Sequence, residues 1–222
     1  MSYVDLHVHS NASDGTLSPE QVVRLAHEAG LSAIALTDHD TTAGVAGAAE
    51  AGAELGLEVG PGIEVSSSFR DHEIHILGLF VDTDSPSLQA ALKEFRHHRD
   101  QRNQEMLGRF DAHGIHLTAE DLCAGNPDTV ITRAHVARAL LAKGLGPDLD
   151  HIFKKYLQYG GIYCPPKEFL PPEAVMEALL DSHAFVALAH PFQYKLGDKA
   201  TEELIAYLAG LGMKGLEVYH SS

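Results

Sequence analysis

The sequence predicts an α/β fold, a mostly parallel sheet or barrel that carries a helical insertion. Apolar runs alternate with helical segments at both ends of the chain, in 1–84 and 174–222, which is typical of βα units. The middle segment, 85–173, contains helical and loop patterns instead. With 222 residues, 45% of them hydrophobic, the chain can bury a proper core.

Four strands are expected in the first third, at 3–7, 33–37, 57–64 and 73–81. After the first, Ser18 can act as an N-cap and Pro19 can occupy the first helical position, so we expect a helix from there to residue 29. Gly30 would end that helix. The alanine-rich segment 42–55 is expected to form the next helix, up to Gly56.

The insertion begins with a long charged helix, expected over 88–112 and ending at Gly114. Thr132 is placed to cap a second helix that runs to Lys143, and glycine and proline pairs mark a long return connection. The βα pattern then resumes with helices at 172–182 and 201–211 and strands at 185–189 and 215–219. These boundaries divide the chain into a barrel, 1–84 with 174–222, and an insertion, 85–173.

Two histidines near the N-terminus indicate a metal site. Side chains alternate along a strand, so His7 and His9 point to the same side and can share one ion. A lone His-x-His is more often a pair of polar residues on a solvated strand face. Here, however, further apolar runs end in His39, Glu64 and His190. Metal-ligand residue types therefore recur where strands are expected to end.

Composition narrows the class of partner. A formal net charge of −15 with no long basic run argues against the wrapping of a long nucleic acid and favours a small anionic substrate held by metals. The two cysteines, Cys123 and Cys164, form no Cys-x-x-Cys pair, which indicates reduced thiols and neither a disulfide framework nor a zinc ribbon. Since neither a signal peptide nor a membrane-length apolar run is present, we expect a cytoplasmic protein with no membrane partner.

Several separated motifs carry a family resemblance: Asp5-Leu6-His7-Val8-His9-Ser10, Asp14-Gly15, Thr37-Asp38-His39-Asp40, Gly62-Ile63-Glu64, His75-Ile76-Leu77-Gly78, Ala189-His190-Pro191 and Glu217-Val218-Tyr219. Their order resembles that of the PHP family, the polymerase and histidinol phosphatase metallohydrolases. The insertion motifs Thr132-Arg133-Ala134-His135 and Lys155-Tyr156-Leu157 resemble the branch that acts on nucleoside monophosphates, nucleoside 3',5'-bisphosphates or short RNA 5' ends.

The resemblance implies a distorted (β/α)7 barrel with two to three divalent ions, Mn, Fe or Zn, and a metal-bridging water as the attacking group. It implies the following ligands: His7 and His9 for the first ion, Glu64 as a bridge to a second ion held by His75 and His190, and Asp14 with His39 for the third. Asp38 and Asp40 would orient a ligand without binding metal. Arg133 and His135 would bind the substrate phosphate at a helix start, and the insertion would select the nucleoside.

One feature departs from the family pattern, because the family supplies its last two ligands from an Asp-x-His motif after a final strand. This sequence stops at Tyr219-His220-Ser221-Ser222, so we expect the last strand and those ligands to lie outside it. The first and third sites would then be short of ligands. His220 is favoured as a rim residue over a substitute ligand.

Other basic residues allow two interpretations. Arg96, Arg99 and Arg102 recur every three residues and would either face the active site or form a solvated stripe; the solvated stripe is favoured. Lys155 and Lys195 would meet phosphate or lie on the surface. The remaining histidines are expected at the surface or at helix caps: His97, His98, His113, His116, His151 and His183.

The function predicted is hydrolysis of a nucleotide phosphate ester by a metal-activated water. Histidinol-phosphate phosphatase remains an alternative because it would share every metal ligand and differ only in the insertion. A PHP-like module that binds metal without turnover is the alternative from another class.

Overall fold

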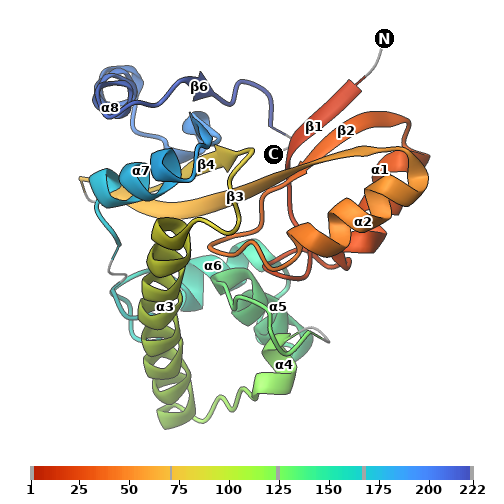
Figure 1. Ribbon diagram of the computed structural model, residues 1–222. Helices are drawn as coiled ribbons and strands as arrows, with labels where there is room; N and C mark the ends of the chain where they lie inside the picture. Colours follow the sequence, from red (N-terminus) through yellow and green to blue (C-terminus); the bar gives the residue numbers. More distant parts are fainter. Residues whose placement is uncertain (1–2, 71, 124–125, 167–168, 221–222) are drawn as a thin grey trace.

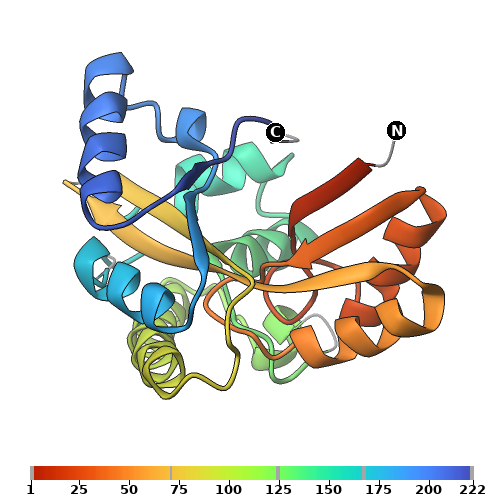
Figure 2. The ribbon, with the colours of Figure 1, turned by 45° about the horizontal axis from the view of Figure 1, so that its top comes forward.

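Figure 1 shows the computed structural model, which describes residues 3–70, 72–123, 126–166 and 169–220. One curled sheet of six strands has the order β1-β2-β3-β4-β5-β6. Its strands are β1 (Tyr3–Val8), β2 (Leu31–Leu36), β3 (Glu58–Phe69), β4 (His72–Leu79), β5 (Phe185–Leu188) and β6 (Gly215–Leu216). Figure 2 shows the sheet curling as a half-barrel, and a groove lined by residues of β1 and β6 lies where the curl is open.

The direction of β4 decides how the site is built. β1, β2 and β3 pair in parallel, as do β5 and β6, but β4 is antiparallel to both β3 and β5. β3 and β4 form a hairpin, which reverses the chain direction, whereas a parallel pair would need a crossover connection. The amino end of β4 therefore lies beside the carboxyl ends of the parallel strands, and a residue near the start of β4 can join the residues that follow those strands.

β3 is longer than the sequence indicates. The strand expected to end at Glu64 continues to Phe69, and Ser66 pairs with His75 across the hairpin. Glu64 consequently lies inside a strand, with a fixed backbone on both sides.

Helices pack on the sheet through separate apolar clusters. α1 (Pro19–Glu28) begins with a capping box in which Ser18 and Gln21 exchange hydrogen bonds, and it packs with α2 (Val45–Leu55) against β2 through Val23, Ile34 and Ala48. A larger cluster, which includes Ile76, Leu179 and Leu208, joins β3, β4 and β5 to α7 (Pro172–Asp181) and α8 (Asp198–Gly210). The short 3-10 helix η1 (Pro191–Tyr194) follows β5.

The insertion has a core of its own. Its helices are α3 (Pro86–Ala112), α4 (Ala119–Cys123), α5 (Arg133–Ala142) and α6 (Leu149–Tyr156). Met106, Phe110, Leu140 and Ile152 are fully buried between them. The first turns of α3 instead join the sheet cluster through Leu92. α3 thus connects the two cores.

Two of these helices, α4 and α6, were not expected from the sequence. α6 begins at an ordinary capping signal, because the Asp148 side chain accepts a hydrogen bond from the backbone N–H of His151. α6 is only eight residues long, and so short a segment shows no clear helical spacing of apolar residues in the sequence. Among the described residues, no helix is both long enough and apolar enough to cross a membrane.

Candidate metal centre and substrate pocket

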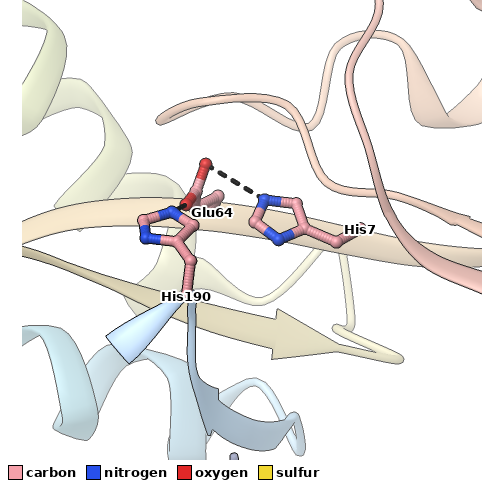
Figure 3. Close-up of side chains that lie close together, drawn as sticks. All are labelled: His7, Glu64 and His190. Carbon is pink, nitrogen blue, oxygen red and sulfur yellow. Dashed lines mark hydrogen bonds and ion pairs between the residues drawn. The ribbon is translucent and has the colours of Figure 1, made fainter. Parts of the chain in front are cut away.

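A single buried carboxylate lies at the centre of a histidine cluster. Glu64 is 1% exposed, and Figure 3 shows His7 and His190 turned toward it from opposite sides. Five imidazole nitrogens lie within 3.3 Å of its carboxylate oxygens: Nε2 of His7, Nε2 of His9, Nδ1 of His39, Nδ1 of His75 and Nε2 of His190. The sequence positions that were expected to hold metal therefore converge on one point.

Strand ends and the β3–β4 hairpin deliver these rings. His7 lies on β1. His39 follows β2, and its backbone forms an isolated parallel β-bridge with Glu64 on the neighbouring strand β3. His75 comes from the antiparallel strand β4, and His190 follows β5. His190 has a φ of 26°, and its backbone N–H donates to Oε2 of Glu217 at 2.7 Å. This contact fixes an unusual backbone conformation at the ring that reaches Glu64.

The donor set fits divalent ions better than it fits hydrogen bonding alone. Nε2 of His7 and Nε2 of His9 lie 3.1 Å apart and both approach Oε2 of Glu64. Nδ1 of His39 lies 3.1 Å from the same oxygen without a hydrogen bond of acceptable geometry, and Nδ1 of His190 is buried with no partner among the described residues. One carboxylate cannot accept from so many imidazoles, whereas imidazole and carboxylate are ordinary ligands of Mn, Fe and Zn.

Two further residues join the cluster that the sequence did not assign to it. Glu217 accepts hydrogen bonds from Nδ1 of His7 at 3.0 and 3.1 Å, and the His220 ring lies 5.4 Å from the His7 ring and 5.2 Å from the His190 ring. Ligand atoms of His7, Glu217 and His220 lie within 4.8 Å of one another. Glu217 directly follows β6, so the rule that acids follow strands would have found it.

Asp14 lies at the side of the cluster that faces the insertion. Its carboxylate is 3.7 Å from Nδ1 of His9 and 3.5 Å from Nε2 of His39. Arg138 of α5 donates two hydrogen bonds to the backbone carbonyl of Asp14, each of 3.0 Å. The insertion therefore fixes the turn that presents this carboxylate.

Asp38 and Asp40 support the backbone on either side of His39. Asp38 accepts hydrogen bonds from the backbone N–H and Oγ of Ser10, at 2.7 and 2.6 Å, and so anchors the loop after β1. Asp40 accepts from the backbone N–H of Ser66 at 3.0 Å and forms a buried ion pair with Arg99. Asp38 and Asp40 therefore fix neighbouring backbone segments, whereas from the sequence we expected them to orient the side chain of a metal ligand.

The pKa values show how strongly Glu64 polarises its neighbours. Burial would lower the pKa of His7, but hydrogen bonds to Glu217 and Glu64 outweigh it and raise the pKa to about 10. His75 is likewise raised to about 9 against burial by Glu64, whereas burial dominates at His39 and lowers its pKa to about 4. Burial would raise the pKa of Glu64, yet the surrounding histidines hold it well below its usual range. Ion binding would displace the protons that these histidines hold.

A cavity of about 490 Å³ lies between the cluster and the insertion. The barrel lines it with Asp14, His39, Ser66, Glu73 and His75. The insertion lines it with Arg99, Arg102, Thr132, Arg133, Ala134, Phe153 and Tyr159. Residues of the histidine cluster and of the insertion therefore line one cavity.

Arg133 lies in this cavity at the start of α5. Its guanidinium stacks 3.8 Å from the centre of the Tyr159 ring and pairs with Glu73 at 3.1 Å. Lys155 is exposed, and its Nζ lies 4.8 Å from the centre of the Tyr156 ring. Lys195 is exposed in the loop after η1, beside a surface pocket away from this cavity.

His135 is placed differently. Its ring is 2% exposed, and its Nδ1 accepts a hydrogen bond from the backbone N–H of Thr132 at 3.0 Å, which completes a capping box for α5. Burial, followed by the nearby Arg138, lowers the pKa of His135 to about 4. His135 is not among the residues that line the cavity, and its hydrogen bond with Thr132 is that of a helix cap.

The expectation of a solvated arginine stripe on α3 is wrong for two of its three members. Arg96 is exposed, but Arg99 and Arg102 are only 8% and 7% exposed and line the cavity. A helical turn takes about 3.6 residues, so residues spaced by three do not stay on one face of the helix. Arg99 and Arg102 therefore face the cavity, whereas Arg96 faces solvent.

Comparisons with known proteins agree with this architecture. The 3',5'-nucleoside bisphosphate phosphatase of Chromobacterium violaceum is 35% identical over 224 residues, which cover 100% of this chain and 78% of that protein. The 5'-3' exoribonuclease Rnm of Escherichia coli is 37% identical over 210 residues, which cover 92% of this chain and 71% of that protein.

Solved structures show the same fold. A structure of a Chromobacterium violaceum amidohydrolase with bound sulfate and no metal has a TM-score of 0.90 at 35% identity, over 97% of this chain and 76% of that one. A Bifidobacterium adolescentis protein assigned as a metal-dependent phosphoesterase has a TM-score of 0.88 at 30% identity, over 99% of this chain and 78% of that one. The family model of the PHP domain matches residues 5–163, and the chain therefore belongs to the PHP domain family.

Proposed function

We propose that this protein is a metal-dependent phosphoesterase that hydrolyses a phosphate ester of a nucleotide. The observation that carries the proposal is the buried carboxylate of Glu64 with five imidazole nitrogens within 3.3 Å. Two relatives, 35% and 37% identical over the aligned residues, are named as a nucleoside bisphosphate phosphatase and a 5'-3' exoribonuclease, which supports a nucleotide substrate.

The proposed ligands form three groups around Glu64, one for each ion. His7 and His9 would hold one ion, and His75 with His190 a second ion that shares Glu64 with the first. Asp14 and His39 would hold a third ion beside the cavity. Glu217, placed on Nδ1 of His7, would orient that ring, and His220 would complete the same side.

When bound, two to three divalent ions such as Mn, Fe or Zn supply Lewis-acid stabilisation of phosphoryl oxygens and activate water for attack. The protein's own residues would bind the substrate phosphate and select the nucleoside. Arg133, stacked on Tyr159 and paired with Glu73, presents a cation at the opening of α5 to the substrate phosphate. The wall contributed by residues 85–173 would exclude water and select the nucleoside, with Phe153 as an aromatic surface.

The charge of the molecule supports a small substrate. A net charge of −15 disfavours the wrapping of a long nucleic acid, whereas a nucleotide or a short 5'-phosphorylated RNA end can enter the cavity. Both cysteines, Cys123 and Cys164, are free, which fits a cytoplasmic enzyme.

Phosphate release tests the proposal. The purified protein, loaded separately with Mn²⁺, Fe²⁺ or Zn²⁺, is assayed on nucleoside monophosphates, a nucleoside 3',5'-bisphosphate, a short 5'-phosphorylated RNA and histidinol phosphate. Release from a nucleotide, abolished by a chelator and by Glu64→Gln, is the expected result. Faster release from histidinol phosphate would assign the alternative phosphatase. Full metal loading without release from any substrate would assign a metal-binding module.

A further inference from the structure

The loop between β1 and α1 carries Asp14, which is a proposed ligand of the third ion. The backbone N–H groups of Ser13 and Gly15 both donate to the carbonyl oxygen of Ser10, at 3.1 and 2.9 Å. Gly15 leaves no room for a side chain, because a Cβ atom there would lie 2.6 Å from the backbone oxygen of His9. The loop is therefore closely wound, with these N–H groups bonded inside it.

The carbonyl oxygens of the same loop are bonded by the insertion instead. Figure 1 shows the chain after β1 running toward the insertion helix α5. Four consecutive residues each accept a hydrogen bond there: Asn11 from Nδ2 of Asn126 at 2.9 Å, Ala12 from the backbone N–H of Val130 at 2.9 Å, Ser13 from Oγ1 of Thr129 at 2.9 Å, and Asp14 from Nη1 and Nη2 of Arg138 at 3.0 Å each. We call the donors Asn126, Thr129, Val130 and Arg138 the carbonyl clamp.

Arg138 is the member of the carbonyl clamp that bonds the proposed ligand residue itself. Both of its Nη atoms converge on one backbone oxygen, and within the described ranges it forms no ion pair with a carboxylate. The side chain of Asp14 stays directed at the cluster, 3.7 Å from Nδ1 of His9 and 3.5 Å from Nε2 of His39. The guanidinium thus holds the backbone of Asp14 and leaves its carboxylate available to an ion.

The other ligand of the proposed third site is held in a different way. The backbone of His39 is fixed by its β-bridge to Glu64, which lies inside β3. Asp14 lies outside the strands, so its loop decides where its carboxylate is placed. A ligand that is already in place binds an ion more tightly, because ordering it on binding would reduce the net binding free energy. The contacts between the insertion and this loop therefore bear on the affinity of the third ion.

We propose that the carbonyl clamp positions Asp14 for the third ion, so that occupancy of this ion depends on the insertion. The inference rests on the proposed function and deepens it, because it assigns the residues that control one ion of that site. Arg138 is a positioning residue that acts through the backbone of Asp14. Because linkage is reciprocal, binding of the same ion should stabilise the insertion.

Metal titration measures the carbonyl clamp directly. The wild type, Arg138→Met and Arg138→Lys are titrated with Mn²⁺, and the number of bound ions and their affinities are determined by equilibrium dialysis and elemental analysis. Arg138→Met should weaken the third ion by about ten- to a hundred-fold, the scale of lost support behind a metal ligand, and leave the ions that share Glu64 unchanged. Arg138→Lys can still donate to the carbonyl oxygen of Asp14 and should give an intermediate affinity.

Two further variants show that the effect runs through Asp14. Asp14→Asn should weaken the same ion, and the double variant with Arg138→Met should be no weaker than Asp14→Asn alone, because both changes act on one ligand. Arg109→Met is the matched control. Arg109 is a half-buried arginine that donates to the backbone oxygen of Gly161 at 3.1 Å, inside the insertion and away from the loop, so its loss should leave every ion bound as in the wild type.

Hydrogen exchange tests the reciprocal effect without any turnover. Addition of Mn²⁺ should slow amide exchange in residues 126–142 of the wild type, because the ion and the insertion stabilise each other through the loop. The slowing should be absent in Asp14→Asn and reduced in Arg138→Met. Equal slowing in all three proteins would contradict the coupling.

The outcomes separate this inference from the proposed function. Wild-type affinities in Arg138→Met, a wild type that binds only the ions sharing Glu64, or additive effects in the double variant would each overturn the carbonyl clamp and leave the phosphoesterase proposal intact. Equal weakening in Arg138→Met and Arg109→Met would overturn it in favour of a general loss of stability. Selective loss of the third ion in a protein that releases no phosphate would support the carbonyl clamp and contradict the proposed function. If Arg138→Met does not fold, the same titration of Arg138→Lys and Asn126→Ala decides.

Discussion

Arg133 and Glu73 meet across the boundary between the insertion and the sheet, with Nη2 3.1 Å from Oε2. The other carboxylate oxygen of Glu73 lies 3.4 Å from Nε2 of His75, a proposed metal ligand. Tyr159 adds a hydrogen bond of 3.1 Å to the same carboxylate. Glu73 therefore contacts both the insertion and a proposed metal ligand.

Replacing Arg133 with Ala should lower kcat/KM by about ten- to a hundred-fold, corresponding to about 1–3 kcal/mol, because a charge-assisted phosphate contact is lost. Bound metal, measured by elemental analysis, should stay at the wild-type level. Lys155→Ala is the control, since this exposed lysine should affect neither quantity. Loss of metal in Arg133→Ala would instead show that the arginine acts through Glu73 and His75.

Glu64→Ala should remove more metal than His75→Ala does, because the carboxylate approaches the rings of all the proposed ions while His75 serves only one. Metal stoichiometry per chain, determined after identical loading and washing, tests this difference. A Glu64 variant that retains the wild-type metal content would remove the bridging role from this residue.

Glu217→Gln should weaken ion binding on the His7 side by about ten- to a hundred-fold, since carboxylates that orient a ligand histidine contribute on this scale. The substitution keeps the shape of the side chain and removes the charge that His7 contacts at 3.0 Å. Metal titration would give the affinity, with Glu202→Gln on the exposed face of α8 as the matched control. Equal affinities in both variants would mean that Glu217 is structural.

His135 should make stability depend on pH. Its folded-state pKa of about 4 lies below the ordinary value of 6.5, so the unfolded chain binds more protons between these pH values. This contribution is complete above pH of about 6.5 and is lost as the pH falls toward about 4. His135→Gln keeps a capping side chain at the third helical position and should reduce the loss of stability between pH 7 and pH 4.5 by about 1–3 kcal/mol.

Urea unfolding at several pH values would measure that difference. The comparison variant is His151→Gln, because His151 is exposed on α6. If the His135 and His151 variants follow the same pH dependence as the wild type, the buried ring does not titrate as its surroundings indicate.

Local patterns predicted much of the molecule. The α/β class and membership of the PHP family are confirmed, and helices such as α1 and α5 begin at the caps that their sequences mark, Ser18 and Thr132. Strand-end histidines and acids were recognised because alternation along a strand is a property of the backbone alone. The same rule would have included Glu217, had it been applied to the shortest strand.

Only the tertiary structure decided which way β4 runs, which face of α3 is covered and how the metal centre meets the insertion. The spacing of Arg96, Arg99 and Arg102 is the same whether the helix faces solvent or a cavity, and only packing on the sheet buries the last two. Likewise, the rings of His7 and His190 meet Glu64 from strands far apart in the chain. Helix caps and strand alternation depend on neighbouring residues and can be found in the sequence, whereas burial and charge pairing depend on residues that only folding brings together.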